Sequence, residues 1–311
     1  MFDSPLSASA YEVLDVDPSV DDEGLRRAYR LQLRRAHPDA GGDAASFIRV
    51  QRAWEVVGTP EGRAAYDRGQ GIAASVEWSG ASRSEGEAGS RPRARSYGQA
   101  GGWHRRRYLA SVREWAGAEV PDPYDPAFVR TVPRELRRML ADALSEEETA
   151  RAVSDLGMGF TVWHDVLTIP RAGSGGADPE AVGKLDHVVL SPTGLYGVRS
   201  VDLGGVARFR GGEIIGPHTE AEAPVTALLT RMRIVARAAR VRFGGGIVVV
   251  PDDALAQTTV PLGLVRGTTV VVARRSALRT VLRQGAPGAR AVGGNELFDV
   301  RTRLQQTIRF A

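Results

Sequence analysis

The chain has 311 residues, 42% of them hydrophobic, with 41 basic and 37 acidic side chains and no cysteine. This length is enough for two domains, each with a hydrophobic core of its own. The absence of cysteine excludes disulfides, a thiol nucleophile and cysteine-ligated zinc sites. No apolar run approaches the ~20 residues that a membrane helix needs, and residues 1–10 lack a signal-peptide pattern. We therefore expect a cytoplasmic protein without a membrane anchor.

An amphipathic helix is predicted between Asp21 and Ala36. Its apolar residues recur at three- and four-residue spacing, and they are Leu25, Ala28, Tyr29, Leu33 and Ala36. Acidic residues fill its first turn, where negative charge favours the helix dipole. The helix must end at His37, because a residue that precedes proline is pushed out of the helical region. Arginines cover most of the remaining surface, at positions 26, 27, 30, 34 and 35.

The loop His37-Pro38-Asp39 follows this helix, and Gly41-Gly42 then allow a tight turn. A second helix is expected from Asp43 as N-cap, with an apolar side that continues to Val57. A short helix over residues 11–14 precedes the pair. Another follows over residues 59–67, started at a position that favours proline. These elements predict a helical hairpin with an exposed loop at one end.

Residues 8–69 resemble the J domain of DnaJ-type proteins in the order and spacing of these elements. In that family the basic second helix and the His-Pro-Asp loop bind a DnaK-type heat-shock ATPase and stimulate its ATP hydrolysis. The resemblance implies that this activity depends on His37, Pro38 and Asp39, with Arg26, Arg27, Arg30 and Arg34 as docking charges. Guanidinium–carboxylate pairs of this kind speed encounter and fix register. Without that context, the tripeptide would be only a helix stop and the arginines a solvated helix face.

Residues 70–102 are rich in Gly, Ser, Ala and Arg and lack periodic apolar positions, so we expect a disordered linker there. Residues 91–107 contain six arginines and no acid, with Tyr97 and Trp103 nearby. This tract either binds nucleic acid or an acidic protein tail, or is a solvated tether. A short helix and a proline-rich connection over residues 103–132 lead to the second domain.

The second domain is predicted over residues 133–311. Helical spacing runs from 133 to 156 and is interrupted at Ser145, which begins a capping-box pattern with Glu148. Short strands are expected over 160–169, 185–190, 195–201, 206–209, 247–250 and 268–272. Helices are expected over 222–240, 276–282 and 296–308. The predicted fold is thus an all-α J domain over residues 1–69, followed by an α/β domain with a mixed sheet flanked by helices.

The run from Lys184 to Val198, preceded by residues 163–166, resembles the nuclease-related (NERD) domain over about residues 145–285. That domain is a branch of the PD-(D/E)xK nuclease superfamily. Nucleases of this superfamily bind magnesium with an aspartate on one strand and an acid on the next, and a lysine two residues later assists the reaction. Asp186 matches the first position, but Arg199 and Val201 occupy the other two.

Two rearrangements would restore such a site. Lys184 shares a strand face with Asp186, and Asp202 or Glu148 would supply a second carboxylate. The plainer interpretations are a strand-end acid for Asp186 and a capping-box partner for Glu148. A lone aspartate without a converging acid is a poor metal site. We therefore interpret Asp186, Glu148 and Lys184 as vestigial nuclease positions in a fold retained for binding.

No catalytic constellation emerges elsewhere, because the five histidines show no metal-ligand spacing and Gly244-Gly245-Gly246 precedes a strand rather than a helix. We expect no enzymatic activity, no metal and no cofactor. The predicted function is that of a co-chaperone that stimulates a DnaK-type ATPase, with residues 133–311 as a targeting module or a module for an unidentified protein client. One alternative is a nucleic-acid-binding protein or divergent metal-dependent nuclease with an accessory J domain. Another is a scaffold whose second domain only oligomerises.

Overall fold

The computed structural model describes residues 5, 9–37, 41–42, 44–67, 93–168, 183–216, 223–288 and 292–311. The chain divides into two compact units. One consists of Met1–Ser84 with Val112–Arg137, and the other of Glu85–Ser111 with Arg138–Ala311. The division falls within α6 (Gly102–Ala116) and α8 (Arg134–Ser154), so each of these helices contributes to both units.

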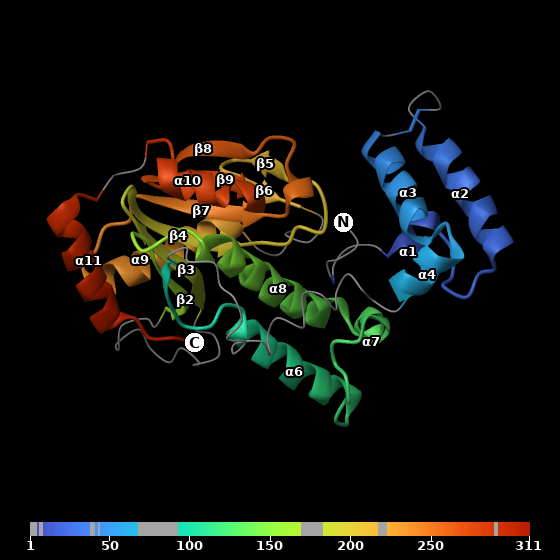
Figure 1. Ribbon diagram of the computed structural model, residues 1–311, viewed down its shortest axis with the longest axis horizontal. Coiled ribbons are helices and arrows are strands. Elements are labelled where there is room, and N and C mark those ends of the chain that lie inside the picture. Colours follow the sequence, from blue (N-terminus) through green and yellow to red (C-terminus); the bar gives the residue numbers. More distant parts are fainter. Residues whose placement is uncertain are drawn as a thin grey trace. The chain divides into compact units, whose positions relative to one another are not determined.

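The described part of the first unit is helical (Figure 1). Its complete helices are α1 (Ala10–Leu14), α2 (Asp22–Ala36), α3 (Ala44–Val57), α4 (Pro60–Asp67) and α7 (Pro126–Thr131). Asp21 is the N-cap of α2 and accepts a hydrogen bond from the Gly24 amide at 2.8 Å. The backbone of His37 is extended and ends the helix. The predicted helical hairpin is confirmed, whereas α7 is an element that the sequence pattern does not predict.

Helices α1, α2 and α3 pack around one small core. Its buried residues are Ala10, Tyr11, Leu14, Leu25, Ala36, Val50, Ala53 and Val57. Tyr29 of α2 stacks on Trp54 of α3 with ring centroids 4.5 Å apart. Arg63 of α4 donates hydrogen bonds to the Tyr11 hydroxyl at 3.1 Å and to the carbonyl oxygen of Pro18 at 2.8 Å. The apolar side of α2 thus faces this core, which leaves its arginines outside.

The second unit is built on a seven-stranded mixed sheet in the order β1-β2-β3-β4-β7-β9-β8. The strands are β1 (Arg95–Tyr97), β2 (Thr161–Leu167), β3 (Lys184–Ser191), β4 (Gly194–Ser200), β7 (Gly245–Val250), β8 (Thr259–Val265) and β9 (Thr268–Arg274). β2, β3 and β4 pair antiparallel to one another, whereas β4, β7 and β9 run parallel. A separate hairpin joins β5 (Arg208–Arg210) and β6 (Glu213–Ile215).

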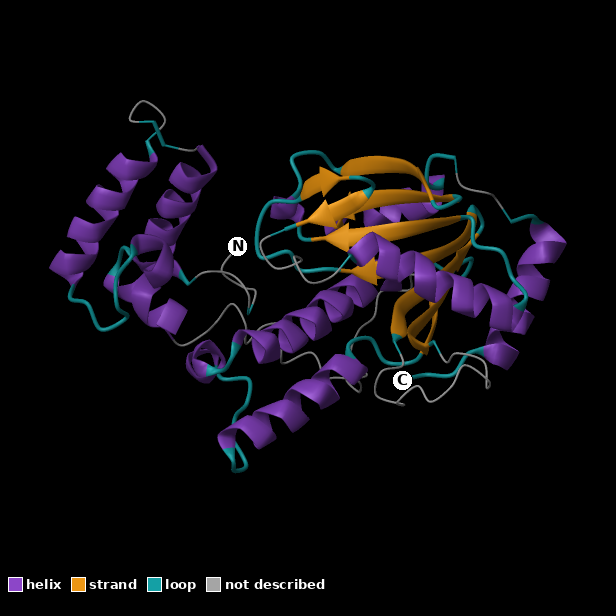
Figure 2. Ribbon diagram, turned by 180° about the vertical axis from the view of Figure 1, so that it is seen from behind, coloured by secondary structure: helices purple, strands orange, loops and turns teal. Residues whose placement is uncertain are grey.

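Helices cover both faces of this sheet (Figures 1 and 2). They include α9 (Pro224–Ala239), α10 (Leu278–Gln284) and α11 (Gly294–Thr307). Val248 and Val250 of β7 belong to the core cluster shared with α9 and α11, whereas Ile247 and Val249 belong to the cluster shared with α8 and α10. This alternation follows from the two-residue period of a strand. The predicted α/β domain with a mixed sheet flanked by helices is confirmed.

Three local predictions are wrong. Ser145 is buried in the interior of α8 and does not interrupt it, so it cannot begin a capping box with Glu148. The predicted linker also extends too far, because residues 95–97 form β1 and pair in parallel with β2. Strands β6 and β8 were absent from the expected elements. Residues 70–92 of the predicted linker lie outside the described residues.

The C-terminal residues complete the edge of the sheet. Phe310 forms an antiparallel bridge with Val166, and the Ala311 amide donates to the carbonyl oxygen of Asp165 at 2.9 Å. β1 pairs with residues 161–163 of the same strand. Most of the β2 edge is therefore paired, which limits open edge pairing. Within the described ranges, no helix is long and apolar enough to cross a membrane.

Candidate functional site

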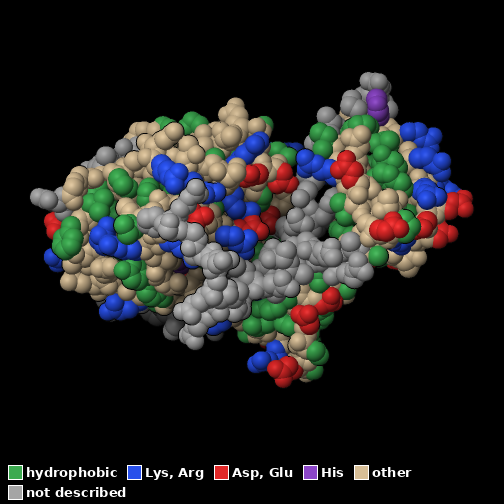
Figure 3. All heavy atoms as spheres, in the orientation of Figure 1, with side chains coloured by type: hydrophobic (Ala, Val, Ile, Leu, Met, Phe, Trp, Pro, Cys, Tyr) green, Lys and Arg blue, Asp and Glu red, His purple; other side chains and the backbone are tan. Residues whose placement is uncertain are grey.

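The first candidate site is the exposed side of α2. All five of its arginines are exposed, and Arg27 pairs with Glu23, one turn away, at 3.1 Å. Both partners of that pair lie largely in solvent. Figure 3 shows basic side chains gathered along this helix, with acidic ones near its start. The helix therefore presents guanidinium groups to any partner with exposed carboxylates.

His37 marks the end of this arginine face. Its carbonyl oxygen accepts a hydrogen bond from the Gly42 amide at 3.0 Å, and its ring meets Phe47 of α3 edge-on at 5.3 Å. The side chain of His37 is exposed. These contacts fix the histidine at the tip of the helical hairpin. Pro38 and Asp39, the other predicted loop residues, and Asp43, the predicted N-cap, lie outside the described residues.

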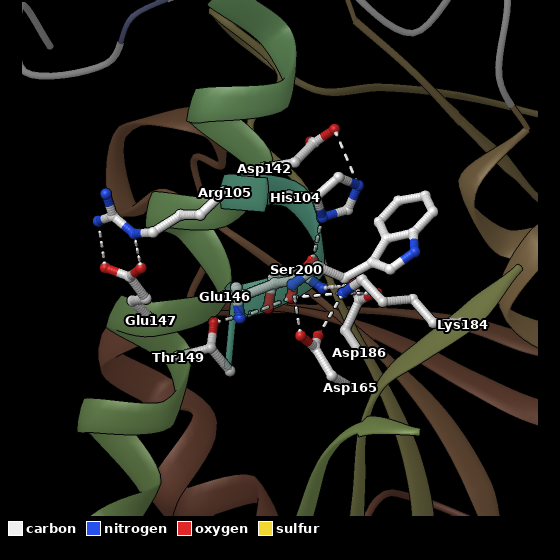
Figure 4. A network of polar contacts seen from close by, with 12 residues as sticks. His104, Arg105, Asp142, Glu146, Glu147, Thr149, Asp165, Lys184, Asp186 and Ser200 are labelled. Carbon is white, nitrogen blue, oxygen red and sulfur yellow. Dashed lines mark hydrogen bonds and ion pairs between the residues drawn. The ribbon is translucent and has the colours of Figure 1, made fainter. Parts of the chain in front are cut away.

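The second candidate site is a buried charge cluster in the second unit, centred on Lys184 (Figure 4). The Lys184 ammonium lies 2.7 Å from Asp165 Oδ1 and 3.4 Å from Asp186 Oδ1, and it also donates to Glu146. Its side chain is only 2% exposed. Lys184 is the only lysine in the chain, where every other basic residue is arginine. A compact ammonium can contact three carboxylates at once, whereas the planar guanidinium group is larger and directional.

Three elements bring the cluster together. Glu146 comes from α8, Asp165 from β2, and Lys184 and Asp186 from alternate positions of β3. Asp165 has a φ of +50°, in the left-handed region that residues other than glycine rarely occupy. In this conformation its second carboxylate oxygen accepts a hydrogen bond from the Trp103 amide at 2.9 Å. The bonds that Asp165 makes thus offset a backbone cost of about 1–2 kcal/mol.

The start of α6 is bound to this cluster. Besides the Trp103 amide, the Gly101 amide donates to Glu146 at 3.1 Å, and His104 Nδ1 lies 2.8 Å from the same carboxylate. Arg105 donates hydrogen bonds from two guanidinium nitrogens to the carboxylate of Glu147 on α8. Negative charge is favourable at a helix N-terminus. The cluster therefore holds α6, α8 and two strands in one arrangement.

Burial and neighbouring charge act against each other on these groups. Burial raises the pKa of Asp165 to about 6 and also raises the pKa of Glu146, and Lys184 opposes both shifts. Burial would raise the pKa of Asp186 as well, but Lys184 and Arg199 hold it well below its usual range. The surrounding carboxylates outweigh burial at Lys184 and raise its pKa. Lys184 and Asp186 are thus an ion pair at neutral pH.

Beside the charge cluster runs a chain of neutral polar groups. His164 Nδ1 and His187 Nδ1 are 2.8 Å apart, and each ring contacts a serine through Nε2: Ser96 at 2.9 Å and Ser200 at 3.2 Å. Ser200 also contacts Thr149 of α8 at 2.9 Å. Burial lowers the pKa of His164 to about 4 and that of His187 well below its ordinary value. Since both rings are neutral at neutral pH, one Nδ1 donates and the other accepts.

The predicted vestigial nuclease positions are only partly brought together. Lys184 and Asp186 are adjacent, as their spacing in the strand requires. Glu148 instead forms an ion pair with Arg275. Asp202 accepts a hydrogen bond from the Gly204 amide at 2.9 Å within a turn. The carboxylates that do converge on Lys184, beside Asp186, are those of Glu146 and Asp165, and neither residue was among the predicted site residues.

A signal for Glu146 was present in the sequence. It lies three residues after Ala143 and four before Ala150, so helical spacing places it on an apolar, buried side of α8. A carboxylate at such a position needs a buried partner. Among the described residues, no group of three or more His, Asp or Glu side chains could hold a metal ion. In this cluster the Lys184 ammonium group, rather than a metal ion, balances the negative charge of the three carboxylates.

Comparison with known proteins identifies the domain that carries the first candidate site. Residues 9–67 match the family model described as the DnaJ domain. A "Chaperone protein DnaJ" of Thermosynechococcus vestitus is 46% identical over 61 residues, which are 19% of this chain and 16% of that protein. A "Curved DNA-binding protein" of Pseudomonas syringae pv. tomato is 42% identical over 60 residues, which are 18% and 19% of the two chains. A "DnaJ protein homolog 2" of Allium porrum is 43% identical over 58 residues, or 19% and 14%.

The N-terminal segment of this chain is therefore a DnaJ domain, and its predicted family is confirmed. The chain spans less than a fifth of the length of each of these curated relatives. No solved structure matches the chain. The resemblance of residues 145–285 to the nuclease-related domain is not confirmed by these comparisons.

Proposed function

We propose that this chain is a J-domain co-chaperone that binds a DnaK-type heat-shock ATPase and stimulates its ATP hydrolysis. The arginine face of α2, at residues 26, 27, 30 and 34, would dock on carboxylates of the ATPase. The loop at His37, Pro38 and Asp39 would then act on it. The observation that carries the proposal is an exposed arginine face that ends at His37 within a DnaJ domain.

The chain would contribute no covalent chemistry of its own in this role. Arginines on an exposed helix provide steering and orientation, which affect the rate of encounter and the register of the complex more than its affinity. ATP hydrolysis would take place in the partner. We accordingly propose that the protein is not an enzyme, and that Lys184 with its three carboxylates is a structural group.

The second unit would select where the ATPase acts. It has its own sheet, its own core and its own set of covering helices. A domain that is attached to a recruitment module raises the local concentration of the recruited ATPase at whatever the domain binds. We therefore propose that the second unit, which contains most of the predicted module over residues 133–311, is a targeting or client-binding module.

The test is a steady-state ATPase assay with the DnaK protein of the same organism and the full-length chain. We expect His37→Gln to abolish stimulation, because the loop would lose its imidazole while α2 keeps its docking charges. We expect Arg26→Gln with Arg30→Gln to weaken binding and to reduce its salt dependence, since two docking charges are removed. Circular dichroism would verify that each variant keeps its helical content.

A matched control is available on α3. Arg49 and Arg52 are also exposed arginines of the same domain, but they lie on the neighbouring helix. Arg49→Gln with Arg52→Gln makes the same change in net charge as the α2 double variant. Full stimulation by His37→Gln, or equal losses in the α2 and α3 variants, would count against the proposal.

A further inference from the structure

A row of arginines lies on the outer side of α9 in the second unit. The inner side of this helix, which includes Leu228, Met232 and Val235, packs into the main core of the sheet. Arg233 and Arg237 are exposed and lie four residues apart on the helix, and Arg240, also exposed, is its C-cap three residues further on. Residues with this spacing share one face of a helix. Figure 2 shows α9 crossing one face of the sheet.

Two neighbouring elements extend the row at its ends. Arg233 donates a hydrogen bond at 3.2 Å to the carbonyl oxygen of Arg266, which lies in the turn between β8 and β9. Arg303 of α11 donates to the carbonyl oxygen of Arg240 at 3.1 Å. Arg242, just beyond the helix, is also exposed. We call this set the α9 arginine row, and its members are Arg233, Arg237, Arg240, Arg242, Arg266 and Arg303.

Among the described residues, no acidic side chain is paired with this row. Residues 223–251 contain five arginines and neither aspartate nor glutamate. In the part of the chain that the structure describes, none of the six arginines forms an ion pair, although Asp299 lies one helical turn before Arg303 on α11. Cations gathered in this way repel one another, and binding of an external polyanion reduces that repulsion.

We propose that the α9 arginine row binds the phosphate backbone of duplex nucleic acid. Arg233 and Arg240 are separated by about 10 Å along the helix axis, a span that covers several phosphates of a duplex. The guanidinium fork matches phosphate oxygens in a bidentate manner. Contacts to phosphates position a protein without reading sequence. The row therefore recognises the backbone and shows no preference among sequences.

The composition of this face favours nucleic acid over a membrane surface. Helices that bind in the membrane interface combine basic residues with exposed Trp, Phe or Leu on the adjoining side. No large hydrophobic residue of α9 is exposed. Leu264 and Phe298 are exposed near the Arg266 and Arg303 ends of the row, but along α9 itself the row has charge without an apolar group to insert into lipid, which is the pattern of a backbone-binding surface.

The experiment measures binding of the full-length chain to a fluorescein-labelled DNA duplex of about 20 base pairs by anisotropy, between about 50 and 200 mM salt. We expect the variant Arg233→Gln, Arg237→Gln, Arg240→Gln to bind roughly tenfold more weakly or worse. The slope of log K against log salt should fall by about 2 to 3, because each phosphate contact contributes about 0.9. A second duplex of scrambled sequence should bind equally well.

The matched control is Arg26→Gln, Arg30→Gln, Arg34→Gln, which removes the same charge from an exposed helix of the J domain. We expect this variant to bind DNA as the parent does. Equal losses in the two triple variants would mean that only net charge matters, and would overturn the proposal. It would also fail if the parent did not bind DNA at low salt, or if it bound phosphatidylserine vesicles while ignoring DNA.

Discussion

Helix α2 and the cluster around Lys184 both concentrate charge, but they place it in opposite environments. The arginines of α2 lie in water, and the ion pair between Arg27 and Glu23 is more than 70% exposed on both sides. The ammonium of Lys184 and the carboxylates around it are almost completely buried. Exposed pairs typically contribute at most about 1 kcal/mol, whereas breaking a buried pair costs about 3–5 kcal/mol.

This difference separates the two kinds of charged residue by what they can do. The α2 arginines make few contacts with the described part of the domain, so a partner can bind them without unfolding it. Lys184 is held by three carboxylates from two strands and a helix, so it has little capacity left for a ligand. A site for partners and a site for stability can thus be told apart by burial, even though both are rich in charge.

The comparison predicts its largest effect at Lys184. Lys184→Met keeps much of the side-chain volume but leaves Glu146, Asp165 and Asp186 without their shared cation. We expect the free energy of unfolding of the second unit to fall by about 3–5 kcal/mol, the usual cost of an uncompensated buried charge. Hydrogen exchange of β2 and β3 peptides in the full-length chain would measure it.

A neutralising variant sharpens this test. Adding Glu146→Gln and Asp165→Asn to Lys184→Met removes two of the stranded charges, so we expect part of the protection in β2 and β3 to return. Arg27→Met on α2 serves as the exposed counterpart and should change protection by less than about 0.5 kcal/mol. If Lys184→Met cost no more than Arg27→Met, the cluster would not hold these elements together.

The paired histidines predict a loss of stability in mild acid. The pKa of His164 is about 4 in the folded state against an ordinary value of 6.5. The contribution of this neutral ring is complete above pH 6.5. It is lost as the pH falls toward 4, because the unfolded chain takes up the proton first. This difference corresponds to about 3 kcal/mol of unfolding free energy, and His187 acts in the same direction.

Asp165 opposes this trend, which makes a variant necessary. Its pKa of about 6 lies above the ordinary 3.8, so the folded state gains stability as the pH falls through this range. We expect the parent still to lose stability between pH 6.5 and 4, because the lowered pKa values of three buried histidines (164, 187 and 104) outweigh the raised pKa values of Asp165 and Glu146. His164→Asn with His187→Asn should reduce that loss, as shown by thermal unfolding at several pH values. A parent curve that is flat or rises toward pH 4 would contradict the assignment.

Local patterns were enough to predict the J domain. The apolar spacing of α2, the acidic residues of its first turn and its end before Pro38 all act within a few residues, so the helix is specified by its own segment. Most strands of the sheet were predicted for the same reason. β1 was missed because three residues in an arginine- and glycine-rich stretch carry no period, and only pairing with β2 makes them a strand.

The buried cluster could not be assembled from sequence alone. Glu146 and Lys184 are 38 residues apart, and Asp165 enters only through a left-handed backbone conformation that no local pattern indicates. At Ser145, a strong local capping signal was overridden because the surrounding helix is buried on both sides of it. Tertiary packing decided these cases, since the free energy of burial exceeds that of one cap.

Arg63 of α4 is intermediate in burial between Arg27 and Lys184, and we expect its substitution to have the smallest of these effects. Its side chain is 16% exposed and donates to the Tyr11 hydroxyl, to Asp22 and to the backbone oxygens of Pro18 and Val20. Arg63→Met would keep the aliphatic stem but leave these acceptors to water. We expect a loss of about 2 kcal/mol, in the range for hydrogen bonds to a charged group. Hydrogen-exchange rates of α1 and α2 amides would measure this loss. A loss as small as that of Arg27→Met would show that the contribution of these charged side chains to stability does not follow their burial.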